Sequence, residues 1–168
     1  MSIPIETERK FVISMPDLEA LTALNGYSSS DIEQTYLTSP RRVTRRVRAR
    51  SYKDGTVYTE TSKIRVDRMS AFEDEREVDK EEYEKLLAEK IKGTVTLKKT
   101  RYTFNYQGRV FEVDVYPNWH KSCILEVELN SSSFEIEMPD FINVIEEVTG
   151  EKKYSNAAMS RKFPKELV

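Results

Sequence analysis

Charged and apolar residues alternate along much of this sequence, and residues 5–11 give the first example. Glu6, Glu8 and Lys10 occupy alternate positions there. Side chains at alternate positions of a strand lie on the same face, so the pattern predicts a strand with three charged groups on one face. Taken alone, such a strand is typical of a half-buried sheet whose charged face meets water. Its interpretation depends on what the other strands do.

Seven further segments have strand-like patterns, and short turns join most of them. They are residues 32–38, 43–52, 57–66, 71–78, 94–106, 111–115 and 123–129. Turn signals such as Lys53-Asp54-Gly55 and Gln107-Gly108 separate them. Eight strands with short connections predict an antiparallel barrel or a strongly curved sheet.

The sign of the charge on the alternating face segregates from strand to strand. The basic positions are Arg46, Arg48 and Arg50, then Lys63 and Arg65, then Lys99 and Arg101. The acidic positions are Glu73, Glu75 and Glu77, then Glu112 and Asp114, then Glu126 and Glu128. Lys98 also lies in a strand, and we choose Lys99 because it shares a face with Arg101.

Three segments have the apolar spacing of amphipathic helices. They are residues 16–24, residues 79–87 with Asp79 as N-cap, and residues 139–149. A short helix is also predicted through Ala157, Ala158 and Met159. The longer helices need an apolar surface on which to pack. If they cover the outside of the barrel, the apolar faces of the strands point outward and the charged faces line a tunnel.

We therefore predict an α+β fold that is mainly β: an eight-stranded antiparallel β-barrel with a charged interior and helices packed outside. Charges crowded away from water are costly unless they are paired, hydrogen-bonded or bound to ions. Guanidinium and ammonium groups suit phosphate oxygens, whereas clustered carboxylates suit Mg²⁺ or Mn²⁺. A complex of polyphosphate and metal would satisfy both sets.

Length and composition exclude several classes of protein and of site. The chain has 168 residues, which suits one domain over residues 1–168, and a net charge of -2, which gives no reason to expect nucleic-acid binding. No segment approaches the roughly 20 apolar residues of a membrane span, so we expect no membrane partner and a cytoplasmic protein. Cys123 and His120 are the only residues of their types. An internal disulfide and a thiolate zinc cluster are thereby excluded.

The charged strands together resemble one known family. The motifs, in chain order, are Glu6-Thr7-Glu8-Arg9-Lys10, Gln34-Thr35-Tyr36-Leu37, Arg46-Val47-Arg48, Lys63, Glu75-Arg76-Glu77, Lys99-Thr100-Arg101-Tyr102, Phe111-Glu112-Val113-Asp114-Val115, Leu125-Glu126-Val127-Glu128-Leu129, Val148-Thr149-Gly150 and Lys153-Tyr154-Ser155-Asn156. In this order the motifs resemble those of the CYTH family, the triphosphate tunnel metalloenzymes. The first motif matches that family's Glu-x-Glu-x-Lys signature.

The resemblance implies a role for each matching position. The phosphate-binding residues would be Lys10, Arg46, Arg48, Arg50, Lys63, Lys99, Arg101 and Lys153. The metal ligands would come from Glu6, Glu8, Asp114, Glu126 and Glu128, with Mg²⁺ or Mn²⁺ as the metal. Lys10, Glu6 and Glu8 would be catalytic, and Glu75 and Glu77 would orient a cation or water. The Arg-x-Arg pattern fits both Arg46/Arg48 and Arg48/Arg50, and Lys153 stands where many relatives have arginine.

The implied activity is hydrolysis of a terminal phosphoanhydride bond. Inorganic tripolyphosphate is the first choice of substrate, because the chain is a compact single domain with no added recognition module. The enzymatic alternatives are a class IV adenylyl cyclase and a nucleoside or thiamine triphosphatase. A module that binds polyphosphate or nucleotide without turnover is the non-enzymatic alternative. The expected partner is a small molecule that contains a triphosphate. Whether the chain forms a homodimer is left open by the sequence.

Overall fold

The computed structural model describes residues 3–130 and 134–167. Its strands are β1 (Ile5–Ser14), β2 (Ser28–Leu37), β3 (Thr44–Tyr52), β4 (Gly55–Arg65), β5 (Ser70–Val78), β6 (Leu97–Tyr106), β7 (Arg109–Val115), β8 (Ser122–Glu128) and β9 (Val144–Glu147). Its helices are α1 (Leu18–Leu21), α2 (Lys80–Leu86), η1 (Leu87–Glu89), η2 (Lys152–Tyr154) and α3 (Asn156–Met159). No helix in the described ranges is long and apolar enough to cross a membrane.

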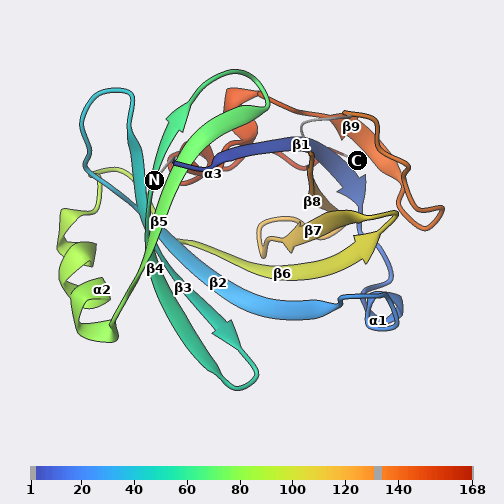
Figure 1. The fold of residues 1–168 in the computed structure, drawn as a ribbon, viewed down its shortest axis with the longest axis horizontal. Coiled ribbons are helices and arrows are strands. Elements are labelled where there is room, and N and C mark those ends of the chain that lie inside the picture. Colours follow the sequence, from blue (N-terminus) through green and yellow to red (C-terminus); the bar gives the residue numbers. More distant parts are fainter. Residues whose placement is uncertain (1–2, 131–133, 168) are drawn as a thin grey trace.

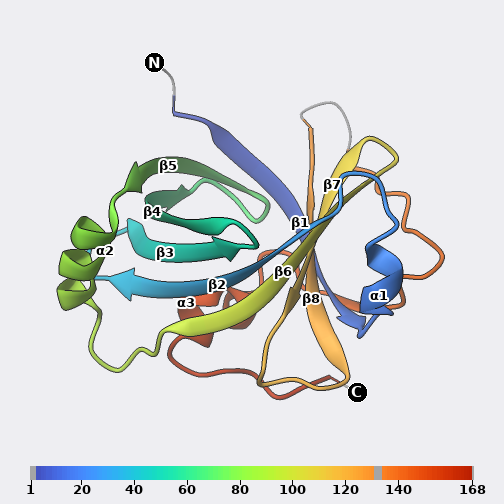
Figure 2. The ribbon, with the colours of Figure 1, turned by 90° about the horizontal axis from the view of Figure 1, so that it is seen from below.

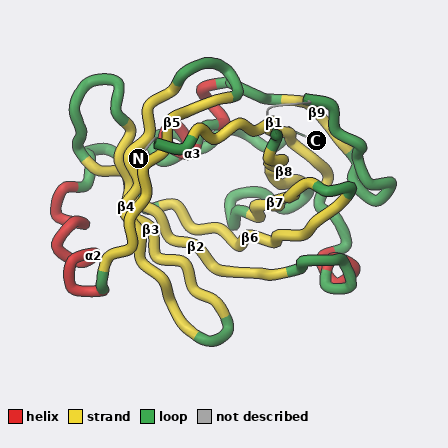
Figure 3. Tube along the Cα trace, viewed as in Figure 1, coloured by secondary structure: helices red, strands yellow, loops and turns green. Residues whose placement is uncertain are grey.

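Eight of the strands form a closed antiparallel barrel (Figures 1 and 2). Their order is β5-β4-β3-β2-β6-β7-β8-β1, and β1 pairs with β5 to close the ring. The registers place Glu8 opposite Glu128 and Lys10 opposite Glu126. This closure confirms the predicted eight-stranded barrel, and Figure 3 shows the strands around the interior with α1 and α2 outside them.

The helix predicted over residues 139–149 is wrong. This segment instead contains β9, which pairs antiparallel with β1 between Phe11 and Ile13. β5 occupies the same edge of β1 only at residues 5–7, so the backbone groups farther along that edge need another partner. Val144 and Ile145 are β-branched and suit an extended strand.

The outer helices α1 and α2 are short, and each has an N-cap side chain that accepts a hydrogen bond from the first turn. Asp79 accepts a hydrogen bond from Glu82 N at 2.8 Å, as expected for an N-cap. Tyr83 and Leu86 of α2 are buried against Leu37, Val47 and Val78 of the barrel. α1 covers only Leu18–Leu21 of the predicted residues 16–24. These contacts confirm that the outer face of the barrel is apolar where helices cover it.

The charged inward face does not extend through the whole barrel. Val12, Ile124 and Leu97 alternate with Lys10, Glu126 and Lys99 and belong to an apolar cluster. Tyr154 and Met159, from the C-terminal segment, complete this cluster. One part of the interior is therefore filled by an apolar plug, and the charged groups are confined to the remainder.

Candidate active site

The charged part of the barrel interior is a cavity of about 610 Å³. All eight barrel strands and the segment 148–157 contribute to its lining. Ten of the residues predicted for the site line it: Glu6, Glu8, Lys10, Arg46, Arg48, Lys63, Glu75, Arg101, Glu126 and Glu128. The alternating charged face thus points inward, and strands distant in sequence bring opposite charges into one space.

Two arginines of β3 each have one buried guanidinium donor without an acceptor in the described part of the chain. Arg48 Nη2 donates to Gln34 Oε1 at 3.2 Å, and Arg46 Nη2 lies 3.5 Å from Glu73 Oε1. The Nε atoms of both arginines are buried without a hydrogen-bond partner among the described residues. Burial, together with the charges of Arg46 and Arg101, lowers the pKa of Arg48 to about 10. Unsatisfied buried donors are costly, so this pair is suited to an anionic ligand.

Arg50 shares the face of Arg46 and Arg48 but does not line the cavity. Its Nε donates to Ser30 Oγ at 2.8 Å, and its guanidinium lies 5.1 Å from the centre of the Tyr52 ring. The geometry therefore favours Arg46/Arg48 over Arg48/Arg50 as the cavity pair.

Lys63 lies between two carboxyl groups on neighbouring strands. Its Nζ is 3.1 Å from Glu6 Oε2 and 3.6 Å from Glu73 Oε2. Burial would raise the pKa of Glu6, but the hydrogen bond with Glu73 and the charge of Lys63 outweigh it and lower this pKa. Burial and the hydrogen bond to Glu6 raise the pKa of Glu73 to about 7. Glu6 thus carries the negative charge of the pair.

Lys10 holds its ammonium group between a carboxylate and a backbone carbonyl. Its Nζ lies 3.3 Å from Glu126 Oε1 and donates to Tyr154 O at 3.2 Å. Burial would lower the pKa of Lys10, but the charges of Glu126 and Glu8 raise it. Lys10 is therefore a fixed cation inside the cavity.

The acidic wall is formed by β1, β7 and β8. Burial and then the charge of Glu126 raise the pKa of Glu8 to about 8. The pKa values of Glu112 and Glu128 are also raised, chiefly by burial. These carboxylates repel one another in a confined space, so a cation among them would be stabilising.

The donor chemistry of this wall fits a divalent metal, because carboxylate oxygens are the ligands that Mg²⁺ and Mn²⁺ prefer. In the described residues, however, no three acidic side chains are placed to hold one ion together. Glu6 and Glu126 instead contact Lys63 and Lys10. Metal binding would require these carboxylates to exchange an ammonium partner for the metal.

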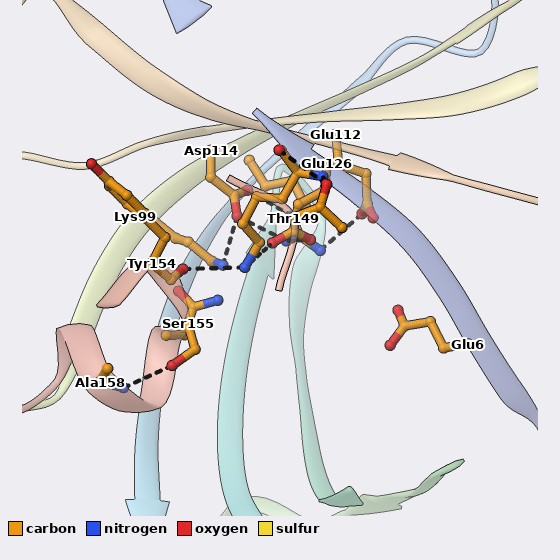
Figure 4. Close-up of polar contacts among 12 residues, drawn as sticks. Glu6, Lys99, Glu112, Asp114, Glu126, Thr149, Tyr154, Ser155 and Ala158 are labelled. Atoms are coloured by element: carbon orange, nitrogen blue, oxygen red, sulfur yellow. Dashed lines mark hydrogen bonds and ion pairs between the residues drawn. The ribbon is translucent and has the colours of Figure 1, made fainter. Parts of the chain in front are cut away.

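Behind Arg101 lies a buried ion pair, Lys99–Asp114, whose two side chains do not line the cavity. Lys99 Nζ is 2.7 Å from Asp114 Oδ2, and both side chains are 0% exposed. Arg101 donates to both oxygens of Asp114 at 2.7 and 2.9 Å and to Glu112 Oε2 at 2.8 Å. Figure 4 shows Lys99, Asp114 and Glu126 close together and Glu6 apart from them. Asp114 is placed to hold Arg101, Lys99 pairs with Asp114, and neither Asp114 nor Lys99 lines the cavity.

Two further predicted residues also lie outside the lining. Glu77, which lies opposite Thr59 on β4, does not line the cavity. Glu75 on the same strand does, and its carboxylate accepts a hydrogen bond from Thr61 Oγ1 at 2.8 Å. Lys153 lies over the Tyr154 ring at 5.0 Å, and its neighbour Lys152 lines the cavity instead.

Several cavity residues were not singled out as site residues from the sequence. Alternation placed Glu73 and Glu112 on the charged face predicted to line the tunnel, and both do line the cavity, but neither was given a role at the site. Arg68 and Lys152 lie in the β4–β5 turn and in η2, where no strand periodicity exists to reveal which side chains face inward.

Comparison with known proteins agrees with this architecture. The family model described as CYTH domain matches residues 4–161. The crystal structure of the inorganic triphosphatase NE1496 is 29% identical, with a TM-score of 0.60, over 95% of this chain and 97% of that one. A second structure of NE1496 is 30% identical, with a TM-score of 0.58, over 95% and 99% of the two chains. No protein with curated annotation matches the sequence.

More distant structures share the fold alone. PH1819 from Pyrococcus horikoshii is 21% identical, with a TM-score of 0.58, over 77% of this chain and 80% of that chain. The family-model match covers nearly the whole barrel and the segment that follows it. This chain belongs to the CYTH domain family.

Proposed function

We propose that this chain is a divalent-metal-dependent triphosphatase that hydrolyses a terminal phosphoanhydride bond, with inorganic tripolyphosphate as substrate. The observation that carries the proposal is that the buried guanidinium groups of Arg46 and Arg48, whose Nε atoms have no hydrogen-bond partner among the described residues, line one cavity together with the acidic wall. The similarity to the inorganic triphosphatase NE1496 supports it.

In this proposal the basic groups hold the phosphates. The guanidinium groups of Arg46 and Arg48 line the cavity and would bind phosphate oxygens, and Lys63 and Arg101 add positive charge around them. Arg101 keeps a fixed orientation because Asp114 holds it from behind. Preorganised cations of this kind stabilise charge without having to move during the reaction.

The acidic wall has the complementary role. Glu6, Glu8, Glu126 and Glu128 would hold a divalent cation, and Asp114 would contribute only indirectly through Arg101. A bound divalent cation offsets the negative charge of the phosphates and lowers the barrier to nucleophilic attack on phosphorus. The raised pKa of Glu8 is consistent with a carboxylate that awaits a cation.

Lys10 is placed to act on the reacting phosphoryl group. Its ammonium donates to Tyr154 O and stays protonated at neutral pH, so once Glu126 exchanges it for the divalent cation it can neutralise developing charge. A water molecule oriented by a carboxylate such as Glu75 attacks the terminal phosphorus in line. The bond between that phosphorus and the bridging oxygen breaks, and the products are orthophosphate and pyrophosphate.

An unesterified polyphosphate fits this cavity better than a nucleotide or thiamine triphosphate. Tyr36 is the one aromatic residue of the lining in the described part of the chain, and it is only 4% exposed. Its hydroxyl accepts a hydrogen bond from Gln34 Nε2 at 3.2 Å. A base or thiamine ring would therefore find no open aromatic face on which to stack.

The test is a substrate panel with purified protein. Tripolyphosphate, ATP and thiamine triphosphate are each supplied with Mg²⁺ or Mn²⁺, and orthophosphate and cyclic nucleotide are measured. The proposal expects orthophosphate from tripolyphosphate at the highest kcat/KM, and none after chelation of the metal. Cyclic AMP from ATP would favour a cyclase, and binding without product would favour a non-enzymatic module.

A further inference from the structure

Three cations lie at one rim of the cavity, beyond the groups used above. They are Arg65 at the end of β4, Arg68 in the β4–β5 turn and Lys152 in η2. All three line the same cavity as Arg46 and Lys63. In the described parts of the chain, none of the three forms an ion pair with a carboxylate. They are therefore available to an anion that extends out of the inner site.

Arg68 is held in place without using its charge. Its Nη2 donates to Thr149 O at 2.7 Å. Gly150, with φ at +73°, packs so closely that an added Cβ would lie 3.0 Å from Arg68 Cβ and Cγ. Among the described residues, no other acceptor contacts the guanidinium group. The β4–β5 turn and the chain before α3 are thus joined at this rim, side by side in Figure 1.

Two carboxylates, Asp67 and Glu151, also line this rim. Asp67 Oδ1 accepts hydrogen bonds from Met69 N and Ser70 N, both at 2.8 Å, and these bonds, with a smaller contribution from the charge of Arg65, lower its pKa. Its carboxylate is therefore engaged by its own turn. Three cations against two carboxylates leave the rim with an excess of one positive charge, whereas the wall that faces Lys10 is acidic.

The rim continues the line of the inner cations. Thr61, Lys63 and Arg65 occupy alternate positions of β4 and so share one face. At roughly 3.3 Å per residue, the Cα of Arg65 lies about 7 Å beyond that of Lys63. A linear chain of phosphates gripped at Lys63 would extend toward Arg65 and then Arg68 as it lengthens.

We propose that Arg65, Arg68 and Lys152 form an outer phosphate subsite, which binds the additional phosphate of linear polyphosphates longer than tripolyphosphate. The proposal rests on the proposed function, since the inner site must hold the first three phosphates. Guanidinium forks match the paired oxygens of a phosphate, whereas a nucleoside at the same position offers no anionic oxygen. The rim therefore selects a fourth phosphate over a nucleoside.

The experiment compares tripolyphosphate with tetrapolyphosphate, both by calorimetric binding and by KM. The variant is the double substitution Arg65→Gln with Lys152→Gln, because the structure gives neither side chain a hydrogen bond that holds the fold. The control is Lys85→Gln with Arg161→Gln, which also removes one lysine and one arginine, but from outside the cavity. Arg68→Gln is measured separately, since it also loosens the contact with Thr149.

The wild-type protein is expected to bind tetrapolyphosphate more tightly than tripolyphosphate. The rim variant should weaken tetrapolyphosphate binding about tenfold, leave tripolyphosphate binding near wild type, and differ from the control in this ratio. Equal weakening for both substrates, or no change for either, would overturn the outer subsite. If no polyphosphate is hydrolysed but the binding ratio responds, the proposed function fails and the subsite stands.

Discussion

Two arginine sites in one barrel differ in how their charge is compensated. Arg101 donates hydrogen bonds to Asp114 and Glu112. Burial alone would lower the pKa of Arg101, but these carboxylates raise it well above its usual value. Arg48 is also buried, yet among the described residues its one side-chain hydrogen bond goes to the neutral Gln34, and burial lowers its pKa to about 10. Carboxylates of the protein thus pair with Arg101, whereas Arg48 has no acidic partner among the described residues.

This difference separates groups that shape the cavity from groups that are suited to bind in it. A charge satisfied by the protein gains little from a ligand, whereas a buried charge without a counterion gains a great deal. We expect substitutions in the Lys99–Arg101–Asp114 network to affect stability first. Substitutions at Arg46 and Arg48 should affect substrate affinity first.

The largest expected effect is that of Asp114→Asn. The substitution leaves Lys99 and Arg101 buried without their shared carboxylate. Removing one partner of a buried ion network typically costs about 3–5 kcal/mol of unfolding free energy. Denaturant unfolding measures the loss, and Asp74→Asn on the exposed face of β5 serves as the control. A loss as small as that of the control would show that the network does not hold the barrel together.

Arg48→Ala should show the opposite balance. The KM for tripolyphosphate should rise about tenfold or more, because a charge-assisted phosphate contact is lost. The unfolding free energy should change by at most about 1–2 kcal/mol, because the loss of the hydrogen bond to Gln34 is offset by removal of a costly buried charge. Arg50→Ala, from the same face but outside the cavity, should change KM much less. The reverse order would favour Arg48/Arg50 as the phosphate-binding pair.

Glu8→Gln tests the acidic wall. With metal and tripolyphosphate, turnover should fall about tenfold or more while the protein stays folded, as for a lost ligand that acts on the transition state. Measured kcat and KM for both proteins decide the point, and Glu128→Gln should behave in the same way. Rates near wild type in both variants would contradict the assignment of these residues to the metal.

The same substitution has a distinct pH signature without metal. The pKa of Glu8 is raised to about 8 in the folded protein, from 4.5 in the unfolded chain. Between these values the folded state binds a proton that the unfolded state does not, so stability falls as pH rises. The slope stays below the limit of about 1.4 kcal/mol per pH unit for one proton. Glu8→Gln should flatten this slope in pH-dependent unfolding, and an unchanged slope would contradict the raised pKa.

The alternating strands could be predicted because a period of two is a local property of the chain. Alternation placed Glu6, Glu8 and Lys10 on one face, and the sign of the opposing charges indicated that this face points inward. The same reasoning could not find β9, because Phe141, Ile142, Ile145 and Val148 also fit helical spacing. What decides the conformation there is the open edge of β1, a non-local feature.

Alternation also could not separate residues that line the cavity from residues behind its wall. Asp114 and Glu112 share a face of β7, yet Asp114 is 0% exposed and Glu112 lines the cavity. Their depth in the barrel depends on strand stagger and on the apolar plug formed by Tyr154 and Met159. Neither feature has a signature in the pattern of a single strand.

The smallest expected effect distinguishes two adjacent lysines. Resemblance assigns Lys153 to substrate binding, whereas the structure places it over the Tyr154 ring and outside the cavity. Lys153→Gln should therefore leave the KM for tripolyphosphate near wild type and cost about 0.5 kcal/mol of stability from the lost cation–π contact. Steady-state kinetics and unfolding of Lys153→Gln beside Arg48→Ala make the comparison. A rise in KM like that of Arg48→Ala would mean that Lys153 turns into the cavity when substrate binds. In that case the contacts a cation makes within the protein would not indicate whether it binds substrate in the segment before α3.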